Sequence, residues 1–287
     1  MEHFGRPAVP LRPFVRGYVQ LDIRLPEPVI LPIPARSASI LEFTLGDPFR
    51  LLFTGHPRHE FAYPVNVVGV QTYRRVELSM RGNVDTFAVL FQPGGLSALF
   101  SVPADALTNQ DLDGRSVLGA WVDDLRDRLG ASSSFAERVR HADHDLLERC
   151  PALRMHGDVV AAARVLLARS GSLRISALIQ QSGLSARQFE RKFGSHIGMS
   201  PKVFARVVRF EAALKRKKQA PGLRWTDVAH ELGYYDHMHM VHDFELLAGA
   251  TPSGLAPEID RIVTDAVEGE RKSGTRPTHV SLHLLLA

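Results

Sequence analysis

Two copies of one segment, about fifty residues apart, occupy the C-terminal part of this 287-residue chain. The copies are offset by 50 residues as far as a shared glycine and by 51 residues after it, so one residue is inserted at that point. Two copies are too few for a solenoid. Each copy instead predicts a short helix, a glycine turn and a second helix. The matching positions are Ile175, Leu178, Ile179, Gly183, Phe189, Arg191, Phe193, Gly198, Ser200 and Pro201 in the first copy, and Trp225, Val228, Ala229, Gly233, Met240, His242, Phe244, Gly249, Thr251 and Pro252 in the second.

The shared glycine stands where a helix-turn-helix unit needs a tight turn. Gly183 and Gly233 hold this position, and glycine tolerates the positive φ of such a turn. Ser185 and Asp236 follow at the expected start of each second helix, where both residue types accept hydrogen bonds from free backbone N–H groups. In such a unit the N-terminal half of the second helix lies in the major groove of DNA. We therefore predict two units that reach one face of a DNA duplex.

A long helix is predicted between the two units. Ser200 is its expected N-cap, Pro201 takes the first position, which favours proline, and the helix is expected to run to about Gln219. Its apolar residues form two stripes, which predicts burial from two sides. A helix of about 18 residues spans about 27 Å. It would hold the second helices of the two units, which we call the reading helices, about one DNA turn, roughly 34 Å, apart. Another helix, His156–Ser170, is expected before the repeat and ends at Gly171.

Positive charge is concentrated on the duplicated segment. The chain carries a formal net charge of +4, yet residues 1–150 carry −2 and residues 258–287 carry −1. Residues 151–257 carry 15 basic and 8 acidic side chains, or +7. This distribution is expected of a surface that binds phosphate groups. The run Lys215-Arg216-Lys217-Lys218 is interpreted either as a DNA-contacting arm or as a solvated helix end favoured by the helix dipole.

The second helix of each unit supplies the candidate base contacts. Phe189 and Phe193 give the first of these helices an inner face and leave polar residues for the outside. Arginine can pair with guanine O6 and N7, and glutamine with adenine N6 and N7. The expected DNA-binding residues are Arg187, Gln188, Arg191 and Lys192 in the first reading helix, His237, Met238, His239 and His242 in the second, Ser185 and Asp236 as caps, and Lys202 and Arg206 as phosphate contacts in the first turns of the long helix.

At these residues the chain resembles the AraC/XylS family of bacterial transcription regulators. The resemblance covers about residues 156–256. It implies a module that binds double-stranded DNA and recruits or positions RNA polymerase, usually as an activator. The motifs are Gly183-Leu184-Ser185, Phe189-x-Arg191-x-Phe193, Gly198-Met199-Ser200-Pro201, Arg209 with Ala212, Ala229-His230-Glu231-Leu232-Gly233-Tyr234, Asp236 through Phe244, and Gly249-Ala250-Thr251-Pro252.

Three positions depart from the family pattern. Ile179 stands where alanine is usual, which asks for a slightly wider helix crossing. Met240 replaces a usual phenylalanine, a mild change at an apolar position. His242 replaces the arginine that commonly faces DNA, and a neutral histidine makes a weaker contact. The first unit is therefore expected to contribute more of the DNA affinity than the second.

The N-terminal part predicts an antiparallel sheet or barrel followed by helices. Its strand-like runs are rich in β-branched and aromatic residues and are bounded by Pro, Gly and Asp. The expected fold is thus an α+β N-terminal domain and an all-α C-terminal domain with two helix-turn-helix units joined by a long helix. The expected strands are Phe14–Ile23, Ser37–Leu45, Phe49–Phe53, Val65–Tyr73 and Thr86–Gln92; the expected helices are 94–101, a stripe at Val117, Trp121, Leu125 and Leu129, and Phe135 to about Arg149.

This part also resembles the sensor domains of one subgroup of the AraC type. The similar fragments are Val68-Gly69-x-Gln71-Thr72, Phe91-x-Pro93-Gly94-Gly95 and Val117-Leu118-Gly119. The resemblance implies a regulatory or dimerisation domain, so control by a small-molecule effector or by homodimer formation is expected. The stripe at Trp121 is interpreted either as core or as a dimer-forming helix face. The expected domains are 1–150, regulatory with a helical linker; 151–257, DNA-binding; and 258–287, a C-terminal extension.

The chain predicts a cytoplasmic protein without a membrane partner. Its single cysteine, Cys150, excludes an intramolecular disulfide and fits a reducing compartment. No apolar run approaches the ~20 residues of a membrane span. The first residues lack the basic-then-apolar pattern of a signal peptide.

No catalytic residues, cofactor or metal are expected. His237, His239 and His242 do not share one helical face, so their spacing disfavours a metal site. His56, His59 and Glu60 are interpreted as a loop. Two other classes stay open: a DNA-repair enzyme that transfers alkyl groups, for which Cys150 before a proline is a poor candidate, and a module that binds a partner protein.

Overall fold

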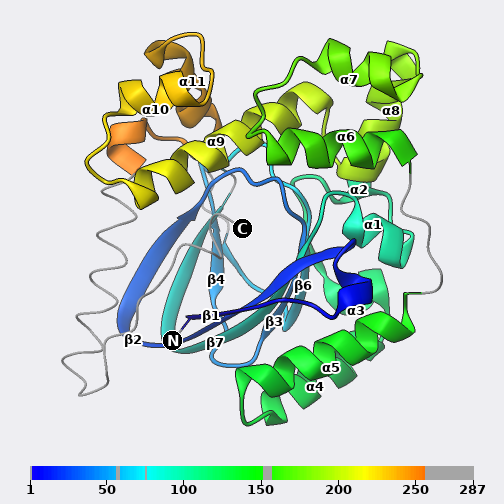
Figure 1. The fold of residues 1–287 in the computed structure, drawn as a ribbon. Helices are drawn as coiled ribbons and strands as arrows, with labels where there is room; N and C mark the ends of the chain where they lie inside the picture. Colours follow the sequence, from blue (N-terminus) through cyan, green and yellow to red (C-terminus); the bar gives the residue numbers. More distant parts are fainter. Residues whose placement is uncertain (1, 56–58, 75, 151–156, 256–287) are drawn as a thin grey trace.

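A curved antiparallel sheet lies between two groups of helices in the computed structural model (Figure 1). The structure describes residues 2–55, 59–74, 76–150 and 157–255. One helical group, α4 and α5, covers one side of the sheet, and the helices of the duplicated segment lie at the opposite end. The expected α+β N-terminal domain and helical C-terminal domain are both confirmed.

Two long strands organise the sheet. β2 (Val15–Ile33) and β7 (Val76–Phe91) pair antiparallel along most of their length. The strand order is β1-β2-β7-β3-β6-β8, and β4 pairs with both β5 and β7. The other strands are β1 (Glu2–Gly5), β3 (Ile40–Thr44), β4 (Arg50–Phe53), β5 (His59–Phe61), β6 (Val65–Val68) and β8 (Asp111–Asp113).

The sequence patterns predicted fewer and mostly shorter strands than this sheet contains. β2 continues ten residues beyond the expected end at Ile23, through a stretch that contains prolines 26, 28 and 32. The pairing register shifts between Leu25 and Val29, and this irregularity accommodates Pro26 and Pro28, whereas Pro32 lies opposite Glu77 in the ladder. Strands β1, β5 and β8 were not predicted, and β6 ends at Val68 rather than Tyr73.

The main sheet core faces α4 and α5. Tyr18, Phe43 and Phe87 are fully buried there, and Phe87 packs on Phe135 of α5 with ring centroids 6.1 Å apart. The Asp85 carboxylate accepts a bidentate ion pair from Arg138 at 2.7 and 2.8 Å. The helices of this domain are α1 (Gly95–Phe100), α2 (Ala104–Leu107), α3 (Gly114–Leu118), α4 (Trp121–Ala131) and α5 (Phe135–Glu148), preceded by the 3-10 turn η1 (Val9–Leu11).

The expected helical stripe from Val117 through Leu129 is broken. Val117 belongs to α3, and Gly119 with φ of 95° separates α3 from α4. Trp121 begins α4, stacks on Phe100 at 5.8 Å between ring centroids, and donates from Nε1 to the Leu118 oxygen at 2.9 Å. These contacts favour the core interpretation of Trp121 over the dimer face.

The helical domain closely follows the sequence prediction. A single cluster of buried side chains runs through both units, and its largest members are the phenylalanines at 189, 193, 204, 210 and 244. The long helix lies between the two helix pairs, as expected (Figure 1). The helices are α6 (Gly157–Ala168), α7 (Ile175–Ser182), α8 (Ala186–Ile197), α9 (Pro201–Gln219), α10 (Trp225–Glu231) and α11 (His237–Ala248).

The residues that follow the expected domain boundary at 150 and the C-terminal extension 258–287 lie outside the described residues, so these domain boundaries stay predictions. Within the described residues, no helix has both the length and the apolar character that crossing a membrane requires.

Candidate nucleic-acid interface

Both turns and both caps have the geometry of helix-turn-helix units. Gly183 and Gly233 adopt φ values of 66° and 67°. The Ser185 hydroxyl accepts from the Gln188 backbone N–H at 3.3 Å, and the Asp236 carboxylate accepts from the His239 N–H at 2.7 Å. Each side chain therefore stabilises the N-terminus of a reading helix, as predicted.

Gln188 has a structural role that the sequence interpretation missed. Its amide oxygen accepts from the Ser185 backbone N–H at 3.1 Å, which completes a capping box. Bidentate pairing with adenine uses that same oxygen, so a base contact by Gln188 would require this bond to open. The Ser-x-x-Gln spacing at 185–188 is the sequence signal of the capping box.

The first reading helix presents a cationic surface. Phe189 and Phe193 are fully buried, with ring centroids 5.7 Å apart, which leaves Arg187, Arg191 and Lys192 exposed on the outside of α8. Lys202 is also exposed, in the first turn of α9. This arrangement places positive charge where phosphates and base edges would approach.

The second reading helix is built alike but carries different chemistry. Met240 and Phe244 form its buried face, and the Phe244 ring meets Phe210 of α9 edge-on at 4.7 Å. His237 is half-buried, whereas Met238, His239 and His242 are exposed. His239 packs edge-on against the Tyr234 ring, and His242 lies 3.7 Å from the Glu245 carboxylate.

Arg206 is half-buried and pairs within the domain, a contact that the sequence patterns did not indicate. Its Nε lies 3.2 Å from the Asp243 carboxylate and ties α9 to the second reading helix. Asp243 is buried, and this desolvation raises the pKa of its carboxyl group despite the nearby arginine. The basic run at the end of α9 is similarly engaged: Arg216 pairs with Glu231 at 2.6 Å and Lys217 donates to the Leu223 oxygen at 2.7 Å.

Tyr235 was missed by the sequence interpretation. Its side chain is 92% exposed, directly before the cap of the second reading helix. The sequence feature that could have indicated an exposed residue here is the one-residue insertion in the second copy, which lengthens the turn between Gly233 and Asp236.

Family models match two parts of the chain. A model described as a helix-turn-helix domain matches residues 178–256, which contain both capped reading helices and the helix that joins them. The C-terminal part of the chain is an AraC-type helix-turn-helix domain. The chain is therefore a DNA-binding transcription regulator. A second model, described as a domain of unknown function (DUF6597), matches residues 3–113 of the regulator.

Similar solved structures include ToxT from Vibrio cholerae O395, with a TM-score of 0.46, 9% identity, and coverage of 84% of this chain and 96% of that chain. A ToxT structure bound to (E)-4-(8-methylnaphthalen-1-yl)but-3-enoic acid has a TM-score of 0.46 and 10% identity, and the match covers 82% of this chain and 95% of that chain. The AraC-like transcriptional activator CuxR has a TM-score of 0.24 and 12% identity, and the match covers 77% of this chain and 86% of that chain. No curated protein matches the regulator.

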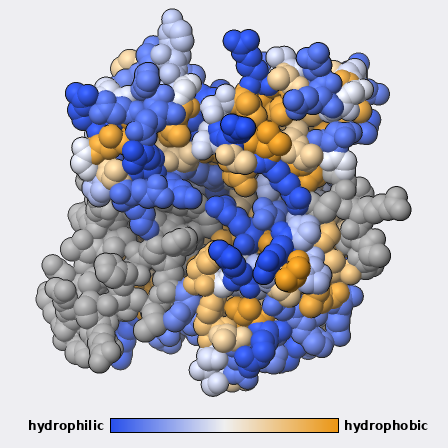
Figure 2. Space-filling view, in the orientation of Figure 1, coloured by the Kyte–Doolittle hydropathy of each residue, from blue (hydrophilic) through white to orange (hydrophobic). Residues whose placement is uncertain are grey.

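The regulator's two domains are joined through both units and the long helix. Glu211 of α9 is buried and accepts from the Ser37 backbone N–H at 2.6 Å and from the Ser37 hydroxyl at 2.7 Å. The Ala35 N–H donates to the Leu247 oxygen at 2.8 Å, at the C-terminal end of α11. Thr108 donates to the oxygen of Gly198, at the corresponding end of α8. The N-terminal ends of the reading helices remain exposed. The surface of the two groups of helices at the top of the space-filling view is mostly hydrophilic, with smaller apolar patches (Figure 2).

This junction predicts a pH-dependent stability. Burial raises the Glu211 pKa from its usual 4.5 to about 7, although Ser37, Arg16 and Arg36 favour the carboxylate. Because the folded-state pKa is the higher one, the stabilisation is complete below pH 4.5 and is lost as the pH rises through 7. Glu211→Gln should therefore reduce the fall in stability over this window by up to about 1.4 kcal/mol per pH unit.

Thermal unfolding of the wild-type protein and of Glu211→Gln between pH 4.5 and 7 measures this difference. Glu245→Gln, at an exposed position of α11, is the matched control and should keep the wild-type slope. An unchanged slope in Glu211→Gln would mean that this carboxyl group does not titrate in that range.

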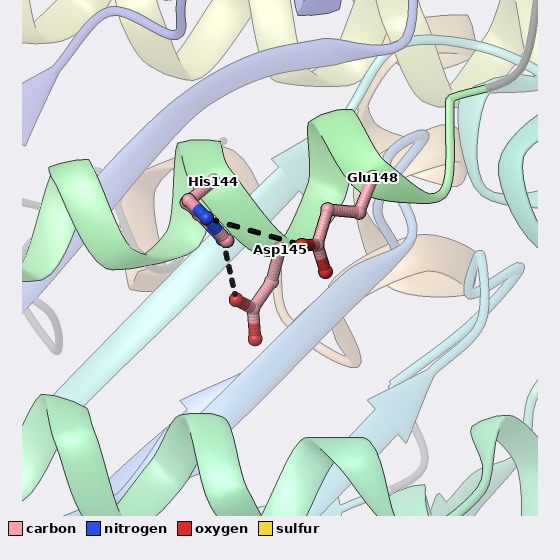
Figure 3. A group of neighbouring side chains, drawn as sticks. All are labelled: His144, Asp145 and Glu148. Atoms are coloured by element: carbon pink, nitrogen blue, oxygen red, sulfur yellow. Dashed lines mark hydrogen bonds and ion pairs between the residues drawn. The ribbon is translucent and has the colours of Figure 1, made fainter.

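One group in the described residues has the residue types of a metal site. His144, Asp145 and Glu148 of α5 lie together in Figure 3. Asp145 also pairs with Arg128, which already balances its charge, and His144 is 65% exposed. These contacts describe an ion-pair cluster at the helix surface. The loop interpretation at His59 and Glu60 was wrong, because both belong to β5; His56 lies outside the described residues.

Proposed function

We propose that this regulator binds double-stranded DNA sequence-specifically, with α8 and α11 in successive major grooves on one face of the duplex. The observation that carries the proposal is the pair of capped reading helices on one rigid helix, each with its N-terminal end exposed. Arg187, Arg191 and Lys192 would supply base and phosphate contacts from α8, and Lys202 a phosphate contact. His237, Met238, His239 and His242 would face DNA from α11.

Footprinting of the full-length protein on its own upstream DNA, at several salt concentrations, tests this proposal. Protection of about two helical turns, with affinity that falls steeply as salt rises, is the expected result. Protection of a single turn would mean that α11 does not enter the groove. Absence of protection at low salt on any genomic fragment would favour a module that binds a partner protein.

Arg187→Ala is expected to cost about 1–3 kcal/mol of binding free energy and to relax base choice at one position of the site. The guanidinium is exposed in the first turn of α8 and can reach a base edge. Affinity for a set of single-base operator variants measures the effect. Lys202→Ala is the matched control and should weaken binding equally on all sequences. An equal loss in Arg187→Ala would instead make Arg187 a phosphate contact.

The N-terminal domain is proposed to regulate binding, through an effector or through homodimer formation. The face of the sheet away from α4 and α5 combines apolar residues with buried polar groups. Thr44 and Thr86 are paired across β3 and β7, and neither side-chain oxygen has a hydrogen-bond partner in the structure as described. Burial and the nearby Asp111 raise the Glu42 pKa to about 7. An effector with polar groups on an apolar body fits such a surface.

Transcriptional activation by contact with RNA polymerase, in the cytoplasm of a bacterial cell, completes the proposal. The same footprint, repeated with RNA polymerase, with metabolite fractions and over a range of protein concentrations, tests these partners. A footprint that none of these conditions alters would argue against regulation by the N-terminal domain.

A non-enzymatic role is part of the proposal. An alkyl-transfer enzyme would need a reactive thiolate, whereas partial burial raises the pKa of the Cys150 thiol. Incubation with alkylated DNA followed by mass measurement of the protein tests the enzyme alternative, and a mass increase on Cys150 would establish it.

A further inference from the structure

The two reading helices differ most at the positions that face outward. With the 51-residue offset, Arg187 corresponds to Met238 and Arg191 to His242. Lys192 corresponds to Asp243, which is buried and paired with Arg206. The second helix therefore has no cation at the three positions where the first helix has one. Its exposed N-terminal surface is instead apolar at Met238, which is 57% exposed.

The insertion in the second turn enlarges this apolar surface. Tyr234 occupies the place that Leu184 takes in the first unit: it is buried and lies 5.1 Å from the Arg209 guanidinium. Tyr235 is the additional residue, and it is displaced outward next to the cap Asp236. We call Tyr235 and Met238, the exposed apolar residues on either side of the cap Asp236, the apolar tip of α11. An exposed large apolar side chain indicates a contact site, because only a bound partner can remove its apolar surface from water.

The electrostatics of the second unit disfavour phosphate attraction as its main contribution. Residues 225–255 contain no lysine or arginine. Two of its carboxylates pair with arginines that lie outside this stretch: Asp227 with Arg224 at 2.9 Å and Glu231 with Arg216 at 2.6 Å. With little cationic charge to displace counterions, this unit gains little affinity from the backbone of DNA.

An apolar tip in the major groove has one chemically matched partner among the base edges. The edges of guanine, cytosine and adenine offer hydrogen-bond donors and acceptors, whereas thymine also offers its 5-methyl group. We propose that the apolar tip of α11, Tyr235 and Met238, reads thymine methyl groups in the half-site of the second unit. The inference rests on the proposed DNA binding through both units and assigns the second unit a role in specificity rather than in charge-driven affinity.

Replacement of thymine by uracil tests this inference, because it removes the methyl group and keeps the base pair. Binding sites are first selected from a random DNA library with the full-length protein, and the half-sites are assigned by the footprint of Arg187→Ala. Uracil in the second half-site is expected to lower affinity about fourfold per contacted methyl, the fold-change for burying one such group. Uracil in the first half-site should have a smaller effect.

Variants of the apolar tip complete the experiment. In Met238→Ala and Tyr235→Ala the difference between thymine and uracil should shrink, whereas Leu246→Ala, 52% exposed at the other end of α11, should keep it. Binding that ignores uracil in the second half-site would overturn the inference and leave the proposed function intact. A uracil effect of equal size in Met238→Ala and Tyr235→Ala would also overturn it. Failure to select any DNA would overturn the proposed function itself.

Discussion

Phe193→Ala is expected to destabilise the DNA-binding domain by about 3–5 kcal/mol. The side chain is fully buried, and its ring lies 5.7 Å from Phe189 and 5.6 Å edge-on from Phe204 of α9. Its removal leaves a cavity between the first reading helix and the long helix, and the neighbouring aromatic rings are too rigid to fill it.

Urea unfolding of the full-length variant, followed by circular dichroism, measures this loss. DNA affinity should fall as well, since α8 would no longer be held in one orientation relative to α11. Leu246→Ala is the control for removing an apolar side chain, and at its exposed position it should cost less than about 0.5 kcal/mol. A cost below about 1 kcal/mol for Phe193→Ala would show that the surrounding helices close the cavity.

The DNA-binding domain could be predicted almost residue by residue because its signals are local. The helix α9 begins at Pro201 after the cap Ser200, whose hydroxyl accepts from the Val203 N–H at 3.4 Å. Its end at Gln219 was also predicted. Helix periodicity, caps and turn glycines are all set within a few residues, so one sequence suffices to find them.

Contacts between distant residues were outside the reach of such patterns. The pair Arg206–Asp243 joins residues 37 positions apart, and the Glu211–Ser37 contact joins residues 174 positions apart. The long strands β2 and β7 escaped prediction for the same reason: each is stabilised by its partner along the ladder, which outweighs the prolines and polar residues within it. Local propensity is a weak guide wherever tertiary pairing decides the structure.

The junction between the domains would give the proposed regulation a physical route. The N-terminal domain contacts the long helix at Glu211 and the C-terminal ends of both reading helices, near Gly198 and Leu247. The bridge between Arg36 and Gln71 links the two segments of the N-terminal domain that make these contacts. A change on the sheet beside this bridge would therefore reach both units at once, while their DNA-facing ends stay exposed.

Gly198→Ala is expected to cost about 2–5 kcal/mol, because two independent effects add. Gly198 ends α8 with φ of 92°, where any other L-residue is strained by roughly 1–2 kcal/mol. A methyl group there would also lie 2.7 Å from Val70 and 3.0 Å from the Ala104 oxygen, both in the N-terminal domain. Overpacking of this kind adds typically about 1–3 kcal/mol.

Gly183→Ala separates the two effects. Gly183 adopts φ of 66°, yet a methyl group there meets nothing within 4 Å, so this variant should show the backbone strain alone. Thermal and urea unfolding of both full-length variants give the difference, which we assign to the clash across the domain junction. Equal losses would mean that the domains separate at no cost near Gly198. A larger loss in Gly198→Ala, together with faster proteolysis between the domains, would show that the close approach of α8 to Val70 holds the first unit against the N-terminal domain.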